Sequence, residues 1–187
     1  MDSLSQVVLG ASVGGAVMGR TLGRSALLGG ALLGTLPDLD VLIDYGDAVA
    51  NFTEHRGFSH SLLVLLPVSL ALAWLLQRWR PVSSLWRWWA FTGLCLLTHP
   101  LLDAFTTYGT RLFWPFGDPV AISSIFIIDP LYTLPLLVAV IVALARPPAM
   151  TALATGLTLS SLYLFWSLVA QQWMTQRVMP TLAQRGL

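Results

Sequence analysis

Residues 59–79 read SHSLLVLLPVSLALAWLLQRW, an apolar run with histidine at its start and arginine near its end. An α-helix needs about 20 mostly apolar residues to cross the hydrocarbon core of a bilayer. This run has that length, and Arg78 is its only Asp, Glu, Lys or Arg. It therefore predicts a transmembrane helix, and the fold depends on how many similar runs accompany it.

The composition of the whole chain also indicates a membrane protein. Of its 187 residues, 56% are hydrophobic and 10% are charged, whereas soluble domains carry about 25% charged residues. The mean hydropathy is +0.72. A net charge of +1 provides no electrostatic basis for nucleic-acid binding. We expect a single integral-membrane domain that comprises residues 1–187.

Similar apolar runs predict an all-α fold, a polytopic membrane bundle of about six transmembrane or partly spanning helices. The expected ranges are 5–19, 25–36, 59–79, 85–103, 125–145 and 149–173. Tryptophan mixed with arginine between the third and fourth helices is typical of helix ends at the level of the lipid headgroups. The sequence does not fix the oligomeric state.

The first two helices are rich in glycine at a spacing of four. The pairs are Gly10/Gly14, Gly15/Gly19 and Gly30/Gly34. This spacing lets helix backbones approach closely in lipid, where packing drives helix association. We expect residues 5–19 and 25–36 to form a tight hairpin that turns at residues 20–24.

All three histidines fall at helix ends that lie on the same side of the membrane. These are the ends of the second and fourth helices and the starts of the third and fifth. The ionisable residues there are Asp38, Asp40, His55, His60, His99, Asp103 and Asp129. Ionisable groups in membrane segments are costly and usually functional. Imidazole and carboxylate bind divalent metals, so we predict one or two ions, with zinc first and manganese, iron or cobalt as alternatives.

Local spacing supports this hypothesis for the histidines. His99 and Asp103 are four residues apart, which places both side chains on one face of a helix. Gly57 lies between His55 and His60, and glycine permits a tight turn that directs both rings inward.

The aspartates and His99 each have a plainer interpretation. Asp38 and Asp40 are two residues apart past Pro37, so in an extended segment they would project to the same side. Either could instead cap a helix or face solvent. His99 could be a hydrogen-bonded core residue, and Asp129 could cap the fifth helix.

Four motifs together resemble one protein family. They are Pro37-Asp38-x-Asp40, the run His55-Arg56-Gly57-Phe58-Ser59-His60-Ser61, His99-Pro100-Leu101-Leu102-Asp103 with Thr107 and Gly109, and Trp114-Pro115-Phe116. The set resembles the YdjM family over roughly residues 7–135. The resemblance implies a location in the plasma (inner) membrane and a metal-dependent hydrolase. Many members continue past the last helix, so we expect a short member or a piece of a longer protein.

The expected function is hydrolysis of a phosphoester in a membrane lipid or lipid-linked substrate. The metal would activate a water molecule near the outer headgroup layer. Asp40 would accept the proton of that water. Arg56 and Arg111 would hold the anionic group, because arginine forms bidentate contacts with phosphate.

Three alternatives remain open at this stage. A membrane-surface metallopeptidase is disfavoured because the chain has no His-Glu-x-x-His motif, and its one glutamate, Glu54, lies outside such a pattern. A metal transporter or sensor would place ligands near the middle of the bilayer. A structural metal would clamp the bundle and leave no open coordination position.

The arginines indicate the orientation in the membrane. Six of them lie on the face opposite the site, which has no acidic residue: Arg20, Arg24, Arg78, Arg80, Arg87 and Arg146. Four lie on the site face. By the positive-inside rule the acid-free face is cytoplasmic, which places the site on the extracytoplasmic face.

This orientation predicts the accessibility of the connection after the second helix. A cysteine introduced as Asp47→Cys should react with a membrane-impermeant maleimide in intact cells, because the connection would face outward. Labelling that occurs only after permeabilisation would reverse the assignment.

Overall fold

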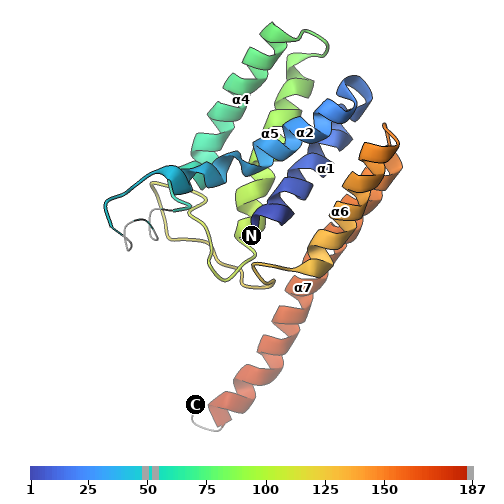
Figure 1. The fold of residues 1–187 in the computed structure, drawn as a ribbon. Helices are drawn as coiled ribbons and strands as arrows, with labels where there is room; N and C mark the ends of the chain where they lie inside the picture. Colours follow the sequence, from blue (N-terminus) through green and yellow to red (C-terminus); the bar gives the residue numbers. More distant parts are fainter. Residues whose placement is uncertain (48–50, 52–54, 185–187) are drawn as a thin grey trace.

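The computed structural model describes residues 1–47, 51 and 55–184, and over these residues the chain is all-α. The helices are α1 (Ser3–Leu22), α2 (Arg24–Thr35), α4 (Leu62–Trp79), α5 (Leu85–Asp103), α6 (Pro130–Ala145) and α7 (Met150–Gln184), with two short 3-10 helices, η1 (Leu36–Leu42) and η2 (Phe58–His60). Within the described residues, Thr110 and Val120 form an isolated β-bridge. The predicted all-α bundle is confirmed (Figure 1).

The helices run back and forth between two ends of the bundle. Figure 1 shows the α1–α2, α4–α5 and α6–α7 turns at one end, and the amino terminus and the long connections at the other. Hydrogen bonds tie the turns together: Arg24 Nε donates to the Leu144 carbonyl at 2.8 Å, and Arg87 donates to the Val17 carbonyl at 3.4 Å. We call this the arginine end.

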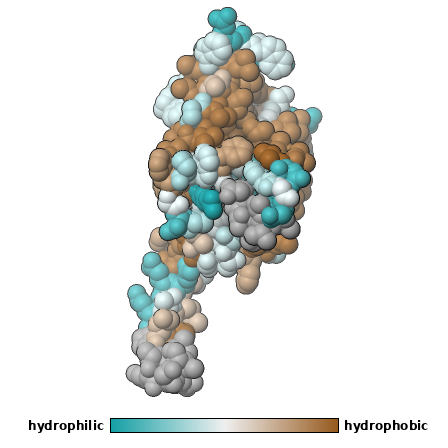
Figure 2. All heavy atoms as spheres, turned by 90° about the vertical axis from the view of Figure 1, so that its left-hand side faces the viewer, coloured by the Kyte–Doolittle hydropathy of each residue, from teal (hydrophilic) through white to brown (hydrophobic). Residues whose placement is uncertain are grey.

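Three helical stretches are long and apolar enough to cross a membrane. They are Arg24–Leu42, Leu62–Trp79 and Met150–Met179, whereas α6 is apolar but shorter. Large apolar side chains face outward from them, such as Leu28 and Phe165. Figure 2 shows apolar residues over the upper helical body, and hydrophilic residues at its upper tip and across its middle and lower part.

Several helix boundaries differ from the predicted ones: α1 spans Ser3–Leu22 and not 5–19, and α4 begins at Leu62 and not at 59. The fifth predicted helix begins at Pro130 and not at residue 125, because Asp129 caps it by accepting from the backbone N–H of Leu131 at 3.1 Å and of Tyr132 at 3.4 Å. The last helix continues past residue 173 to Gln184.

The first two helices pack backbone against backbone. A β-carbon on Gly10 would overlap the carbonyl oxygen of Gly30, and one on Gly14 would lie 2.6 Å from the Ala26 carbonyl oxygen. Gly23, with φ of 59°, makes the turn between α1 and α2. The predicted glycine hairpin is confirmed.

The end of the bundle opposite the arginine end carries the long connections, and we call it the site end. Polar contacts hold its connections against each other. The backbone N–H of Leu62 donates to the Leu112 carbonyl at 2.8 Å, and Ser61 Oγ donates to the Trp114 carbonyl at 2.9 Å. The backbone N–H of Arg111 donates to the Arg56 carbonyl at 3.3 Å. The connection before α4 and the one after α5 therefore form one layer over the helix ends.

The glycine contact predicts position-specific effects on stability. Gly10→Ala should destabilise the protein by about 1–3 kcal/mol through overpacking. Gly19→Ala is the matched control, because its β-carbon would find only Met150 Sδ, at 3.5 Å. Thermal unfolding in detergent micelles measures both. Equal melting temperatures for the two variants would contradict the close α1–α2 contact.

Candidate metal centre

Four ionisable side chains converge at the site end of the bundle. Asp38 comes from η1, His60 from η2, and His99 and Asp103 from the last turn and a half of α5. One candidate ligand atom from each lies within 4.8 Å of the others. His60, His99 and Asp103 are fully buried, whereas the Asp38 side chain is 23% exposed. We call these four residues the metal cluster.

Five of the six separations among the cluster atoms are close to the edges of a tetrahedral metal site. His99 Nε2 lies 3.1 Å from His60 Nε2 and 3.3 Å from Asp38 Oδ1. His60 Nε2 lies 3.4 Å from both Asp38 Oδ1 and Asp103 Oδ2, and His99 Nε2 lies 3.6 Å from Asp103 Oδ2. Zinc bonds of about 2.0–2.1 Å give a tetrahedron whose edges are about 3.3–3.4 Å. A zinc-sized ion fits between these atoms.

Hydrogen bonds on the far side of each imidazole direct both Nε2 lone pairs into the cluster. His99 Nδ1 lies 2.5 Å from the Gly34 carbonyl oxygen, which can only accept a hydrogen bond. Ser59 Oγ donates to Asp40 Oδ2 at 2.5 Å, so it accepts from His60 Nδ1 at 2.8 Å. Metal-bound histidines are held by such partners. Two lone pairs that face each other at 3.1 Å require a cation or a proton between them.

The carboxylate of Asp103 is held on one oxygen and left open on the other. Its Oδ1 accepts from Gln6 Nε2 at 3.1 Å and contacts the amino group of Met1. Its Oδ2 is buried without a hydrogen bond from the described residues, although Arg56 Nε lies 3.4 Å away. Buried polar atoms are rarely left unsatisfied. The open oxygen faces the histidines and fits a metal ligand.

The electrostatics of the cluster also favour a cation. Burial lowers the pKa of His60, but the carboxylates of Asp103 and Asp38 raise it by more, so that it lies above its ordinary value. The attraction that retains a proton on this imidazole would act equally on a metal ion.

Asp40 lies beside the cluster and does not join it. The segment after Pro37 is a 3-10 helix, so the prediction that Asp38 and Asp40 project to the same side of an extended segment is wrong. Asp40 instead accepts from the backbone N–H of Arg56 at 3.0 Å and lies 2.9 Å from His55 Nδ1.

The backbone turn between His55 and His60 does not depend on glycine, contrary to the prediction. Arg56, and not Gly57, has the positive φ, at 64°. A non-glycine residue in this conformation stores strain, and such residues gather at functional sites. The hydrogen bond from its N–H to Asp40 holds it there. His60 therefore points into the metal cluster while His55 points to Asp40.

The structure does not bring Asp129 into the metal cluster. Its Oδ1 caps α6, and its Oδ2 accepts from the Tyr163 hydroxyl at 2.8 Å. The plainer interpretation of this residue as a helix cap therefore matches its contacts. Among the described residues the cluster is the one group of three or more potential ligands at this spacing.

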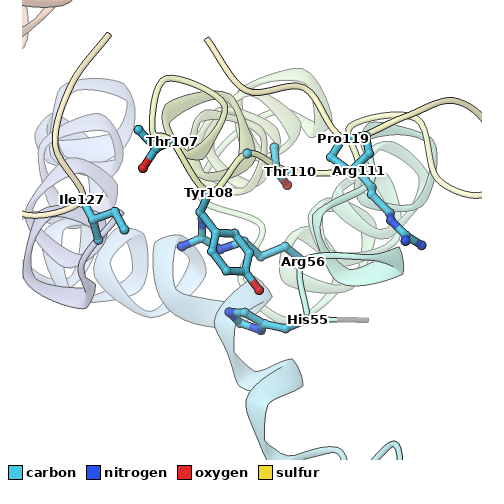
Figure 3. A pocket seen from close by; sticks show the side chains of 9 residues that line it. His55, Arg56, Thr107, Tyr108, Thr110, Arg111, Pro119 and Ile127 are labelled. Atoms are coloured by element: carbon cyan, nitrogen blue, oxygen red, sulfur yellow. The ribbon is translucent and has the colours of Figure 1, made fainter. Parts of the chain in front are cut away.

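A pocket of about 470 Å³ adjoins the metal cluster through Arg56, and none of the four cluster residues lines it. It is lined by His55, Arg56, Thr107, Tyr108, Gly109, Thr110, Arg111, Pro119 and Ile127. The Arg56 guanidinium carbon lies 4.6 Å from the centre of the Tyr108 ring. Figure 3 shows the Tyr108 hydroxyl directed toward His55, and Arg111 at the opposite side of the pocket with its guanidinium pointing away from Tyr108. Both arginines singled out from the sequence therefore line the pocket, on opposite sides of it.

Burial affects the chemistry of two pocket side chains, Tyr108 and Arg56. Burial raises the pKa of Tyr108, so its hydroxyl remains a hydrogen-bond donor at neutral pH. Arg56 is only 8% exposed, and its Nη1 is buried without a hydrogen bond from the described part of the chain. An unpaired buried guanidinium nitrogen at a pocket wall fits an anionic ligand.

Three residues that contribute to the site were not predicted from the sequence. Gln6 and Ser59 orient cluster residues, and Tyr108 covers Arg56. An amide inside the apolar first helix was a usable signal for Gln6. Ser59 stands within the quoted histidine motif, but only the fold shows that its hydroxyl lies between His60 and Asp40.

These features define a class: an α-helical membrane protein with a buried His/Asp group that could hold a metal ion. The sequence comparison agrees. Residues 1–174 match the family described as YdjM inner membrane protein, so the chain belongs to the YdjM family.

Two curated relatives support the assignment. The inner membrane protein YbcI of Escherichia coli is 41% identical over 95 residues, which are 49% of this chain and 54% of the relative. A protein of Bacillus subtilis, described as uncharacterized protein YfhP, is 29% identical over 172 residues, which are 88% of this chain and 51% of the relative. The chain spans about half the length of each. No solved structure matches.

The cluster predicts which histidines carry a metal. His60→Ala and His99→Ala should each lose the bound divalent ion, because each removes a lone pair directed into the cluster. His55→Ala should retain it, since His55 contacts Asp40 and not the cluster. Metal content per purified chain, by inductively coupled plasma mass spectrometry, measures this. Loss in His55→Ala together with retention in His99→Ala would contradict the assignment.

Proposed function

We propose that this protein is a membrane-embedded metal-dependent hydrolase that cleaves a phosphoester of a lipid or lipid-linked substrate with a metal-activated water. The observation that carries the proposal is a preformed four-ligand cluster beside a pocket that contains two arginines. A divalent ion, zinc in the first instance, would lower the pKa of a bound water toward neutrality. Asp38 is the exposed ligand, so the open side of the cluster is at Asp38.

Proton transfer is proposed to involve Asp40 through His55. The His55 imidazole lies at the pocket wall, with Nδ1 held 2.9 Å from Asp40 Oδ1. An Asp that fixes one imidazole nitrogen leaves the other to accept a proton. His55 is then the proton acceptor, and Asp40 positions it. The same Asp40 holds Ser59 and, through it, His60, so this carboxylate links the two halves of the site.

Arg56 and Arg111 are proposed to hold the phosphate. Arg56 supplies Nη1, which is buried without a hydrogen bond from the described residues, and its guanidinium stacks on the Tyr108 ring. Arg111 lines the same pocket from the far side. Guanidinium groups suit phosphate because they donate two parallel hydrogen bonds.

A structural metal is the second candidate, and one observation favours it. Four protein ligands complete a tetrahedron, which is the arrangement of closed structural zinc sites. Such a site would stabilise the bundle and would need neither the pocket nor the Asp40–His55 pair. The peptidase alternative remains disfavoured because the chain has no His-Glu-x-x-His motif, and its one glutamate, Glu54, lies outside the described residues.

The test is hydrolysis by the purified protein in phospholipid vesicles with added zinc, with the water-soluble and lipid products identified by mass spectrometry. His55→Ala should retain the metal and lose about 10²–10⁴-fold in rate. Arg56→Gln should raise KM. Arg78→Gln, at the arginine end, is the matched control for loss of a charge. An unchanged rate in His55→Ala would overturn the proton-transfer assignment. Metal removal that lowers the melting temperature, with no hydrolysis in any phospholipid, would favour the structural metal.

A further inference from the structure

The arginine end marks one boundary of the lipid layer. Trp79 and Trp86 flank the α4–α5 turn and are 74% and 70% exposed, next to Arg80 and Arg87. Exposed tryptophan mixed with arginine is the signature of the membrane–water interface. Leu85, the first residue of α5, lies at this level.

Distance along α5 gives the depth of the metal cluster. His99 and Asp103 lie 14 and 18 residues after Leu85, which is about 21 and 27 Å at 1.5 Å per residue. The hydrocarbon core is about 30 Å thick. Tilt of the helix only shortens the vertical distance. Both ligands therefore fall short of the far boundary.

The last helix gives the same depth independently. It begins at Met150, near the arginine end, and its Tyr163 and Gln171 contact the long connection at Asp129 Oδ2 (2.8 Å) and the Ile122 carbonyl (2.7 Å). These two positions lie about 20 and 32 Å along the helix from its start. The Asp129 end of the connection therefore lies inside a hydrocarbon core of about 30 Å, and its Ile122 end lies at the far boundary of that core.

Exposed apolar side chains flank the site outside the long helices. Val41 and Leu42 on η1 are 71% and 79% exposed, and Phe126 and Ile128 before α6 are 80% and 72% exposed. We call these four residues the collar. Leu42 ends the apolar stretch Arg24–Leu42, so the collar continues the lipid-facing surface of the helices. Clustered exposure of this kind marks a surface that water does not cover.

We propose that the metal cluster and its pocket lie below the membrane surface, within the hydrocarbon layer, and that the collar contacts the acyl chains of the surrounding bilayer lipids. Ile127, between two collar residues, lines the pocket, so the collar adjoins one wall of the pocket. Together with the proposed function, this depth means that the scissile group reaches the pocket sideways from the bilayer and not from the aqueous phase.

The experiment measures depth without reference to activity. Nitroxide labels on Phe126→Cys and Ile128→Cys are examined in phospholipid vesicles by power-saturation spin resonance, with oxygen and a nickel complex as relaxants. Leu134→Cys on the exposed face of α6 is the hydrocarbon control, and Arg177→Cys on distal α7 is the water control. The wild type supplies the background, since its only cysteine, Cys95, is buried.

The collar labels should show an oxygen-to-nickel accessibility ratio several-fold above that of Arg177→Cys and close to that of Leu134→Cys. Ratios at both collar positions that match Arg177→Cys would overturn the proposal and place the connection in water. That outcome would leave the metal cluster and the hydrolase proposal intact, because neither depends on depth.

Discussion

The placement of two carboxylates among apolar helices is the constraint on which the site end of this protein depends. A charge removed from water is costly unless it is paired and hydrogen-bonded. One oxygen of Asp103 accepts hydrogen bonds from the Gln6 amide and the amino group of Met1. Its other oxygen faces the Nε2 atoms of two imidazoles. A cation at the centre of the cluster, or a proton held between the two imidazoles, satisfies this arrangement, and a metal ion satisfies both carboxylates and both imidazoles at once.

The glycine hairpin provides the scaffold for this arrangement. Gly34 packs so closely on α1 that an added β-carbon would lie 2.9 Å from the Gln6 carbonyl oxygen. The same residue offers its carbonyl to His99 Nδ1, and Gln6 offers its amide to Asp103. Backbone contact between α1 and α2 therefore sets the positions of the groups that orient the ligands on α5. The orientation of His99 and Asp103 therefore depends on the packing of α1 against α2.

Much of this could be predicted from the sequence because helix periodicity and helix ends are local properties. The spacing of His99 and Asp103 on one helical face required no tertiary information. The division between His60, which enters the cluster, and His55, which contacts Asp40, could not be predicted. It depends on a 3-10 helix at residues 36–42 and on a hydrogen bond from the Arg56 N–H to Asp40, 16 residues away in the chain. Gln6, 97 residues from Asp103, is linked to it only by the fold.

The most direct test of the central claim is the coordination of the bound ion in the purified protein, by zinc X-ray absorption spectroscopy. The account predicts an ion with two imidazole nitrogens and two carboxylate oxygens at about 2.0–2.1 Å, and a water oxygen as a further ligand if the metal is catalytic. A spectrum without imidazole scattering, or one with only water-like oxygen ligands, would contradict it.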